Sequence, residues 1–443
     1  MPELSPLPPL SHKRVVYVLK GYPRMSELFI ASEIWRLEQR GVPLRIYVLK
    51  PADEPTHHPV VDKIATPPAY LPPTTPLSGV ALLPWLVRNA GPFLPSVRRY
   101  ARRHPLRLAR TMAVVGAQSV RAHKGWKPRS IYVKELLQAL WIAADLEAAG
   151  DARWLHAHFA HGTTTVSWLV AQLLDLPFSF TGHAKDIYRE SLNPAGLLAR
   201  KMRAAEFVVT CTGANVAHLR RIAPEADVHL AYHGLNADFA ELLSSAPPRP
   251  EPAEPAPVRV LSVGRLVRKK GFDVLVEASA LLRRRGVDLE VLVAGEDGDE
   301  ADRVRRLVRE RGLEDVVRLC GPWSQEELLA QCRRATMFVL ACRIDEDGDR
   351  DGIPNVLVEA MAAELPVVST WVSGIPELVV DGVNGLLVPS EDPRALAEAM
   401  LRLIRDPALR GRLAVAGQAT VASTFDGDAL AEQMADLLGA GTP

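Results

Sequence analysis

The stretch D-G-I-P-N-V-L-V-E, from Asp351 to Glu359, decides how this chain is interpreted. Pro354 suits the first turn of a helix, because the N–H that proline lacks would have no helical partner there. Gly352 allows backbone geometry that a Cβ would forbid. The free amides of residues 355–357 would then point outward from a helix N-terminus, which is a favourable site for a phosphate group.

An acid stands at each end of this stretch. Glu359 lies two turns beyond Gly352 among apolar residues, which predicts a mostly buried helix in which the carboxylate needs a partner. Such a pair suits a sugar nucleotide, with one acid for sugar hydroxyls and the other for ribose hydroxyls. A buried helix with a chance acid explains the same residues, and the local sequence does not separate the two interpretations.

Two metal-binding patterns overlap this stretch, and both are weak. Asp347-Gly348-Asp349 forms a D-x-D pattern. A three-residue acidic pattern in a polar loop is weak evidence for a metal site, and a solvated loop explains it better. Asp347, Asp349 and Asp351 also imitate the first half of a calcium loop. That loop needs a glutamate at its twelfth position, which is Val358 here, and Pro354 breaks its geometry. We therefore expect no bound metal and no cofactor.

Composition places the chain among globular proteins. Its 443 residues suggest two or three domains. The net charge of +1 lacks the strong positive charge that is typical of nucleic-acid-binding proteins. The four cysteines lack metal-ligand spacing, which indicates a reducing compartment. No secretory signal and no run of about 18 apolar residues is present. We expect a cytoplasmic protein that is soluble or peripheral on the inner face of the cell membrane.

Short apolar runs alternate with helical patterns, which predicts parallel sheets covered by helices. Two runs, 15–19 and 44–49, are joined by a helix that Ser26 would cap and that ends near Arg40. The chain shows no short repeat, only two successive α/β units. Further strands are expected at residues 154–159, 178–181, 207–210, 228–231, 258–263, 289–294, 316–319, 337–341 and 366–369.

A linker with six prolines in residues 247–257 separates the two units. The expected domains are a first Rossmann-like domain over 1–245, with a basic insertion at 66–130, and a second over 258–425. The linker is placed at 246–257. Residues 426–443 are expected to form a C-terminal helix that could pack back on the first domain.

Three strands end in loops that contain histidine, and the carboxyl ends of parallel strands share one edge of a sheet. His161, His183 and His233 lie in these loops. A lone buried histidine is usually structural, but several at strand ends are more suggestive of a site. His183 is the strongest candidate, because Lys185 and Asp186 follow it closely.

Arg265 and Lys270 lie in a glycine-flanked loop directly after the strand 258–263. An arginine fork and a lysine point charge at this spacing suit a pyrophosphate. A solvated basic loop is the alternative, since Arg268 and Lys269 are also charged. The phosphate-binding interpretation is favoured because the helix start at 352–357 is expected on the same sheet edge.

The segment 66–130 is rich in proline and arginine, and no acidic residue occurs between Asp62 and Glu135. Its arginines alternate with apolar residues in a loosely helical pattern. One interpretation is a basic amphipathic surface for anionic lipid. The other is a helical hairpin whose arginines simply face water.

Taken together, these motifs resemble the retaining GT-B glycosyltransferases of family 4, and among them the bacterial exopolysaccharide and colanic-acid type. The matching motifs are Y-P-R-M-S-E-L-F-I at 22–30, H-A-H-F at 156–159, F-T-G-H-A-K-D-I at 180–187, V-G-R-L-V-R-K-K-G at 263–271 and the paired acids at 351 and 359. The resemblance implies two Rossmann-like domains facing each other across a cleft. It also implies a nucleotide-sugar donor held mainly by the second domain and an acceptor held by the first.

The resemblance assigns residue roles. It gives His183, Asp351 and Glu359 to the transferred sugar, its hydroxyls and the ribose, respectively, as the catalytic set. The expected donor-binding residues are Arg265, Lys270, Gly352, Ile353, Pro354, Asn355, Val356 and Glu359. The expected acceptor-side residues are Gly21, Tyr22, Ser26, His161, Lys185 and Asp186.

Two departures from the family pattern matter. The first acid of the motif is usually glutamate and is Asp351 here, one methylene shorter, which affects the sugar contact and the identity of the donor. The segment 160–162, Ala-His-Gly, replaces a shorter glycine-containing turn, so the acceptor-side loop is expected to differ.

The leading hypothesis is a retaining, metal-independent hexosyltransferase. It would move a hexose from a UDP- or GDP-sugar to a saccharide or polyprenyl-linked acceptor in cell-surface polysaccharide synthesis, without nucleic-acid partners. The alternative is a nucleotide-sugar-binding or scaffold protein with weakened catalysis. A phosphorylase has no supporting signal. Because no motif supplies a carboxylate nucleophile, a front-face transfer is expected rather than a covalent intermediate.

Overall fold

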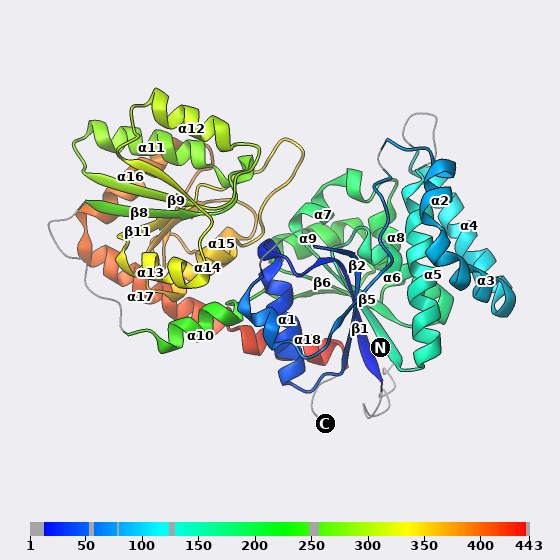
Figure 1. Cartoon of the computed structure of the whole chain (residues 1–443). Coiled ribbons are helices and arrows are strands. Elements are labelled where there is room, and N and C mark those ends of the chain that lie inside the picture. The colour runs from blue at the N-terminus through cyan, green and yellow to red at the C-terminus, as the bar shows by residue number, and fades with distance from the viewer. Residues whose placement is uncertain (1–12, 53–56, 78, 124–128, 248–256, 440–443) are drawn as a thin grey trace. The chain divides into compact units, whose positions relative to one another are not determined.

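The computed structural model describes residues 13–52, 57–77, 79–123, 129–247 and 257–439. Contacts divide the chain into two units. The first unit holds residues up to Cys211, residues 216–231 and residues from Ala431 onward, and the second holds residues 212–215 and 232–430. Each unit is an α/β domain with one parallel sheet (Figure 1). Most of the proline-rich linker, residues 248–256, lies outside the described residues.

The first unit contains a seven-stranded parallel sheet in the order β3-β2-β1-β4-β5-β6-β7. Its central strands are continuous buried apolar runs, as expected for strands covered by helices on both faces. The strands are β1 Arg14–Tyr22, β2 Leu44–Pro51, β3 Pro68–Tyr70, β4 Ala152–His158, β5 Phe178–Gly182, β6 Phe207–Thr210 and β7 Val228–Leu230. The strand order reverses between β1 and β4, so the loops after these two strands flank the crevice where such sheets bind ligands.

The helices of the first unit connect and cover this sheet. They are α1 Leu28–Gln39, α5 Ile131–Ala149, α6 Thr163–Leu174, α7 Ala184–Tyr188, α8 Leu197–Ala204 and the part of α9 Gly213–Ile222 that follows Asn215. The expected cap at Ser26 was wrong: residue 26 lies within a 3₁₀ turn, Met25–Glu27, and α1 begins at Leu28. The turn places the helix start one residue later than the capping pattern predicted.

The basic insertion contains β3 and three helices, α2 Leu82–Asn89, α3 Leu94–Arg103 and α4 Pro105–Arg121. Helices α3 and α4 pack against α5, and α4 also contacts α6. Trp85 of α2 is buried with Phe93 and with Leu137 of α5. All three helices therefore rest on α5. None of the described helices has the length and apolar character required to span a membrane.

The second unit contains six parallel strands in the order β10-β9-β8-β11-β12-β13, which is the strand order of a Rossmann fold. They are β8 Val258–Val263, β9 Leu289–Ala294, β10 Val317–Gly321, β11 Met337–Val339, β12 Val367–Thr370 and β13 Leu386–Val388. The helices are α10 Ala237–Ser245, α11 Phe272–Arg284, α12 Ala301–Glu310, α13 Gln325–Arg334, α14 Asn355–Ala362, α15 Ile375–Leu378, α16 Pro393–Arg405 and α17 Pro407–Thr424. The order reverses between β8 and β11.

The boundaries of the units differ from the sequence interpretation, chiefly at the end of the first domain. The sequence placed residues up to 245 in the first domain, whereas the structure places the chain from Tyr232, including α10, in the second unit. The last helix, α18 Gly427–Leu437, belongs to the first unit from Ala431 onward. There Gln433 donates a hydrogen bond to the carbonyl of Leu230 at 2.8 Å, and Arg153 donates to the carbonyls of Leu438 and Gly439.

Candidate functional site

Two loops meet at the point where strand order reverses in the second unit. One follows β8 and runs from Gly264 to Gly271, and the other follows β11 and leads into α14. Gly271 fixes their close approach. It has a φ of +67°, and a Cβ on it would lie 1.8 Å from the carbonyl oxygen of Ala341. A side chain at this position would therefore push the two loops apart.

Asp351 lies between two lysines of the β8 loop. Lys269 Nζ is 3.1 Å from Asp351 Oδ1, and Lys270 Nζ is 2.7 Å from Oδ2. Burial alone would raise the pKa of Asp351, but the two ammonium groups outweigh it and hold the pKa well below its ordinary value. Asp351 is thus an ionised group fixed by charge-assisted bonds. The sequence had identified Lys270 as a phosphate ligand, but not its pairing with the acid.

The acidic loop before Asp351 is closed on itself. The Gly348 amide donates to the carbonyl of Asp345 at 2.9 Å, and the Asp349 amide donates to Asp347 Oδ1 at 2.9 Å. The Asp349 carboxylate is 3.2 Å from Lys269 Nζ. One acid of the D-x-D pattern is therefore used in an ion pair and the other in a turn, which gives the pattern a structural purpose without a metal.

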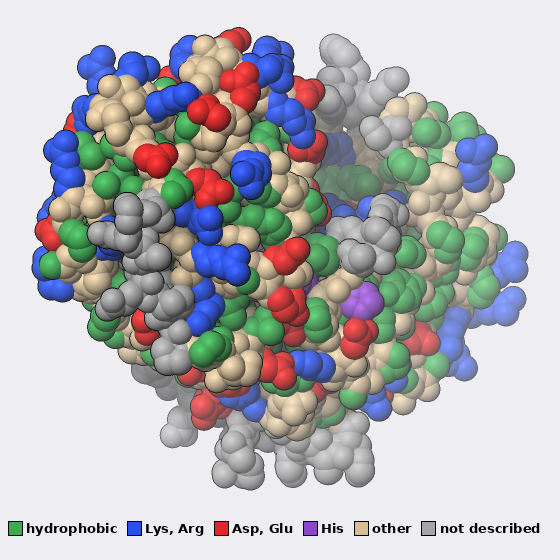
Figure 2. Space-filling view, turned by 60° about the vertical axis from the view of Figure 1, so that its left-hand side comes forward, with side chains coloured by type: hydrophobic (Ala, Val, Ile, Leu, Met, Phe, Trp, Pro, Cys, Tyr) green, Lys and Arg blue, Asp and Glu red, His purple; other side chains and the backbone are tan. Residues whose placement is uncertain are grey.

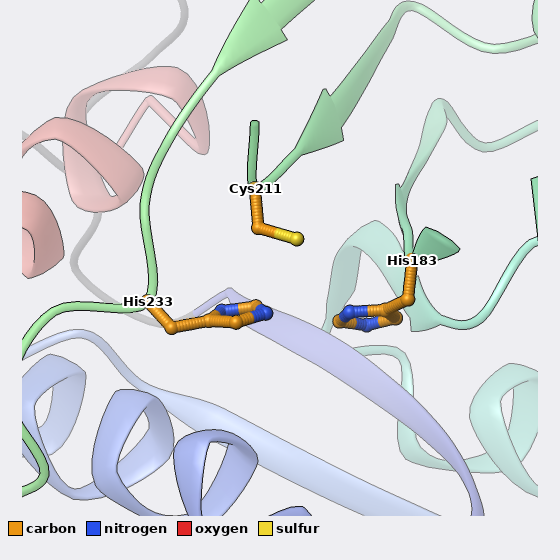
Figure 3. Close-up of side chains that lie close together, drawn as sticks. All are labelled: His183, Cys211 and His233. Carbon is orange, nitrogen blue, oxygen red and sulfur yellow. The ribbon is translucent and has the colours of Figure 1, made fainter. Parts of the chain in front are cut away.

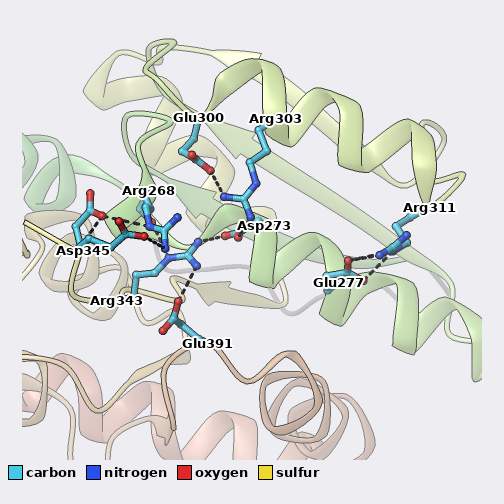
Figure 4. A network of polar contacts seen from close by, with 10 residues as sticks. Arg268, Asp273, Glu277, Glu300, Arg303, Arg311, Arg343, Asp345 and Glu391 are labelled. Carbon is cyan, nitrogen blue, oxygen red and sulfur yellow. Dashed lines mark hydrogen bonds and ion pairs between the residues drawn. The ribbon is translucent and has the colours of Figure 1, made fainter.

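A buried arginine, Arg343, ties the two loops together (Figure 4). Its Nε donates to the carbonyl of Arg268 at 2.9 Å, and its backbone amide donates to that of Lys269 at 2.9 Å. Its other guanidinium nitrogens pair with Asp273, at the start of α11, and with Glu391 at 3.1 Å. The sequence gave no signal for this role, because a lone arginine after a strand is not distinctive.

Arg265 is the exposed cation of the β8 loop. Its side chain has no ion-pair partner among the described residues, in contrast to Lys269 and Lys270. Lys270 packs its aliphatic stem against Gly264, where a Cβ would lie 3.1 Å from Lys270 Cε. The two predicted diphosphate ligands thus stand on one loop, one of them free for a ligand and the other paired with Asp351.

Helix α14 begins at Asn355, with Pro354 at its N-cap position rather than in its first turn. The Leu357 amide donates to the carbonyl of Pro354 at 2.9 Å, so the expectation that the amides of 355–357 are all free was wrong for residue 357. The helix closes its first turn tightly and uses that donor. Gly352 and Ile353 lie in the bend before it, half-buried.

Glu359 is buried within α14, with 2% of its surface exposed. Its Oε1 accepts a 2.6 Å hydrogen bond from Asn236 Nδ2, at the start of α10. Burial raises the pKa of Glu359 to about 7, although the amide of Asn236 partly opposes this shift. We predicted from the sequence that Glu359 is buried and needs a hydrogen-bond partner, but nothing in the sequence identified Asn236 as that partner.

In the first unit, His183 caps α7 directly after β5 and is mostly buried. Its ring lies between Phe29 and Phe159, with centroids at 5.0 and 4.7 Å. It also stacks on His158 with a centroid distance of 5.7 Å. Figure 3 shows His183 with Cys211, which follows β6, while His233 in that view belongs to the second unit. The aromatic frame holds the imidazole in one orientation.

A hydrogen-bonded chain continues behind His183. His158 Nδ1 lies 3.5 Å from His183 Nε2, and His158 Nε2 lies 3.1 Å from Glu33 Oε1. Tyr17 donates to the same Glu33 oxygen at 2.8 Å. Burial would raise the pKa of Glu33, but His158 outweighs it and the pKa falls to about 2. Glu33 lies in α1, three residues after the first matching motif ends, and the sequence gave no reason to single it out.

Asp186 and Lys201 brace the loop between β4 and α6. The Asp186 carboxylate accepts from the amides of Ala160 and His183, the latter at 3.0 Å. Lys201 donates to the carbonyl of Ala160 at 2.9 Å and to Asn193 Oδ1 at 3.0 Å. Asp186 therefore positions His183 and the loop rather than pointing to solvent, while Lys185 is exposed. Lys201 was not foreseen, because its burial depends on tertiary packing.

The other acceptor-side candidates lie near the end of β1. Gly21 and Tyr22 are its last residues and are buried, and the Tyr22 carbonyl accepts from Tyr70 at 3.2 Å. His161 Nε2 lies 3.3 Å from Lys20 Nζ. Burial lowers the pKa of His161 to about 3, and the nearby lysines add to the shift. His161 is therefore neutral at pH 7. Residue 26 lies in the turn after β1.

Comparisons with known proteins agree with this geometry. Residues 248–420 match the family model "Glycosyl transferases group 1", so the second unit carries a domain of that family. The second unit is one α/β domain, and the chain with its two α/β domains has the GT-B fold. A solved sucrose-phosphate synthase from Thermosynechococcus elongatus matches 96% of this chain and 98% of its own, with a TM-score of 0.66 and 20% identity. The match to Anabaena HepE, solved in complex with UDP, covers 96% of this chain and 100% of the HepE chain, with a TM-score of 0.63 and 16% identity.

Sequence relatives are more specific but cover less of the chain. The amylovoran biosynthesis glycosyltransferase AmsK of Erwinia amylovora is 40% identical over 182 residues, which is 41% of this chain and 44% of the relative. The putative colanic acid biosynthesis glycosyltransferase WcaL of Escherichia coli is 43% identical over 153 residues, 34% of this chain and 37% of the relative. The matches span less than half of these relatives.

Proposed function

We propose that the chain is a retaining glycosyltransferase of exopolysaccharide synthesis. It would transfer a hexose from a UDP- or GDP-sugar to a saccharide or lipid-linked saccharide without a divalent metal. The observation that carries the proposal is the cluster of Arg265, Lys269, Lys270 and Asp351 at the strand-order reversal of the second unit. It combines the charges of a diphosphate site with a carboxylate suited to sugar hydroxyls.

The donor diphosphate would bind to Arg265 and Lys270. Arg265 offers a guanidinium fork without a competing acid among the described residues, and Lys270 adds a compact charge. Lys269 would stay paired with Asp349 and Asp351 at 3.2 and 3.1 Å and keep the acid in place. The amides of Asn355 and Val356 at the start of α14 would supply further donors to the phosphates.

Asp351 would accept hydrogen bonds from the transferred sugar, and Glu359 would meet the ribose. His183 would contact the sugar on the acceptor side, with Tyr22 and His161 nearby in the same unit. Asp351 is held by two lysines and has a binding role in this proposal, so the proposal assigns no carboxylate nucleophile. The leaving diphosphate would instead help deprotonate the acceptor hydroxyl, while Arg265 and Lys270 stabilise its growing charge.

The donor site can be tested by calorimetric titration of UDP and GDP into the full chain. Arg265→Ala and Lys270→Ala should each weaken binding by about 1.5–3 kcal/mol, or roughly 10- to 150-fold, because each removes a charged hydrogen-bond partner. Arg284→Ala is the matched control, as Arg284 is an exposed arginine of the same unit. Unchanged affinity in both test variants would contradict the assignment.

Transfer itself needs a second assay. A panel of UDP- and GDP-hexoses, with and without lipid-linked acceptors, should identify a donor that yields product with the donor's anomeric configuration, as read by NMR. Tight nucleotide binding with no transfer to any acceptor would favour the alternative of a nucleotide-sugar-binding protein. The short Asp351 side chain, already engaged by two lysines, is the feature that would favour that outcome.

A further inference from the structure

The outward face of α4 is apolar, which is unusual for a surface helix. Leu106 and Val120 are 80% and 62% exposed, and the alanines at 113 and 117 between them are exposed as well. These four positions fall within one side of the helix at 3.6 residues per turn. The opposite side, with Leu108 and Val115, is buried against the unit. Helix α4 is thus apolar on both sides.

A second helix of the insertion repeats this pattern. Leu83 and Val87 of α2 are 73% and 83% exposed and are one helical turn apart, so they share a face. Trp85, between them, is buried against Leu137 of α5. Since α2 and α4 both rest on α5, the two apolar faces are held by one helix. We call the exposed apolar residues and their neighbouring arginines the insertion face.

The insertion face is strongly basic. Four exposed arginines of α3 and α4 form no ion pair with a described residue, namely Arg98, Arg102, Arg103 and Arg110. Residues 63–134 contain no acid, and the described acid that reaches this region is Glu147 of α5, which pairs with Arg99 and His104 at 2.9 and 2.6 Å. In Figure 2, Lys and Arg side chains project among hydrophobic ones at the right-hand edge, which belongs to the first unit.

The chemistry of the face selects its partner. If the arginines only faced water, the residues beside them on the outward side should be polar. Instead Leu106 and Val120 on that side are 80% and 62% exposed. A second copy of the same face would place unpaired arginines against arginines. An anionic bilayer satisfies both features, because apolar side chains enter the acyl boundary while arginines meet the lipid phosphates. We propose that the insertion face docks the first unit on an anionic membrane surface.

Binding can be measured by co-sedimentation of the full chain with sucrose-loaded vesicles, without any sugar donor. Vesicles of phosphatidylcholine alone are compared with vesicles that contain 30% phosphatidylglycerol, at low and at high salt. Each basic residue near an anionic surface contributes about fivefold in affinity, so three of them together contribute on the order of 100-fold. The triple variant Arg102→Ser, Arg103→Ser, Arg110→Ser should therefore bind anionic vesicles at least tenfold more weakly, and high salt should weaken the native chain likewise.

The apolar part is tested by Leu106→Ser with Val120→Ser. Both side chains are exposed, so the fold should persist by circular dichroism, while binding to anionic vesicles falls several-fold. Arg412→Ser with Val415→Ser is the matched control: both lie exposed on α17 of the second unit and should leave binding unchanged. Equal binding to neutral and anionic vesicles, binding to neither, or a dimer that only the Leu106 and Val120 changes dissociate would overturn the proposal.

Discussion

The buried Glu359 makes the stability of the second unit depend on pH in a defined way. Its pKa is raised to about 7 in the folded chain, against about 4.5 in the unfolded chain, because burial disfavours its charge. Below pH 4.5 both states are protonated and nothing is lost. As the pH rises from 4.5 to 7, the unfolded state ionises first and the folded state loses stability. Above pH 7 the loss is complete, at about 3 kcal/mol.

Glu359→Gln removes this charge and keeps an oxygen that can accept from Asn236 Nδ2, now 2.6 Å from Glu359 Oε1. The gain in unfolding free energy over the native chain should be about 1 kcal/mol at pH 5 and about 3 kcal/mol at pH 8. The difference of about 2 kcal/mol corresponds to roughly 4–8 °C in the melting temperature of a unit of this size. The charge thus destabilises the unit at the pH where the residue would contact a ribose.

Differential scanning calorimetry of the full chain at pH 5 and pH 8 measures the effect as a shift of the second unit's transition. Glu310→Gln is the control, because Glu310 is an exposed acid of the same unit. A pH-independent difference between Glu359→Gln and the native chain would refute the reasoning. So would a variant that is less stable than the native chain at pH 8.

Other outcomes follow from the same contacts. Asp351→Asn should lower transfer while leaving UDP or GDP affinity within a few-fold, as measured by initial rates and calorimetry. Excess EDTA should leave transfer unchanged, whereas complete loss restored by Mn²⁺ would support Asp347-Gly348-Asp349 as a metal site. Glu33→Gln should lower kcat and shift its pH profile without affecting nucleotide binding, because Glu33 acts through His158; Glu38→Gln, on the same helix, is the control. Mass spectrometry of turnover mixtures should detect no glycosyl ester on Asp351.

The sheets of this chain could be read from its sequence because their strands are short, buried and rich in β-branched residues. Residues 207–210, 258–263 and 289–294 were predicted with the bounds that the structure shows. The edge strands β3 and β13 were not predicted, although β7 and β11, which also have three residues, were. Strand β3 begins at a proline in a proline-rich segment, which obscures a strand pattern. The Rossmann-like class and the GT-B fold followed from strand–helix alternation and motif order.

The candidate site could be predicted only at the level of loops. Motifs place Lys270 and Asp351 after two strands, β8 and β11, that start at Val258 and Met337, but the 2.7 Å contact between the two side chains depends on tertiary packing. Arg343 and Lys201 act as buried charges, and Glu33 acts through its bond to His158. Such roles become visible only once the partners are in place. Sequence motifs therefore identify candidate ligand-binding residues in loops, such as Lys270 and Asp351, more readily than the residues that position those loops.

The return of α18 to the first unit also bears on how the chain is made. Residues 216–231 complete the sheet of that unit, but Gln433 and the carbonyls of Leu438 and Gly439 contact it only after the whole second unit has been synthesised. At about 5–20 residues per second, the roughly 200 intervening residues take some 10–40 s. During that interval the nascent first unit leaves the Leu230 carbonyl and Arg153 without these partners, so the unit whose synthesis began first is completed only after the second unit has been made.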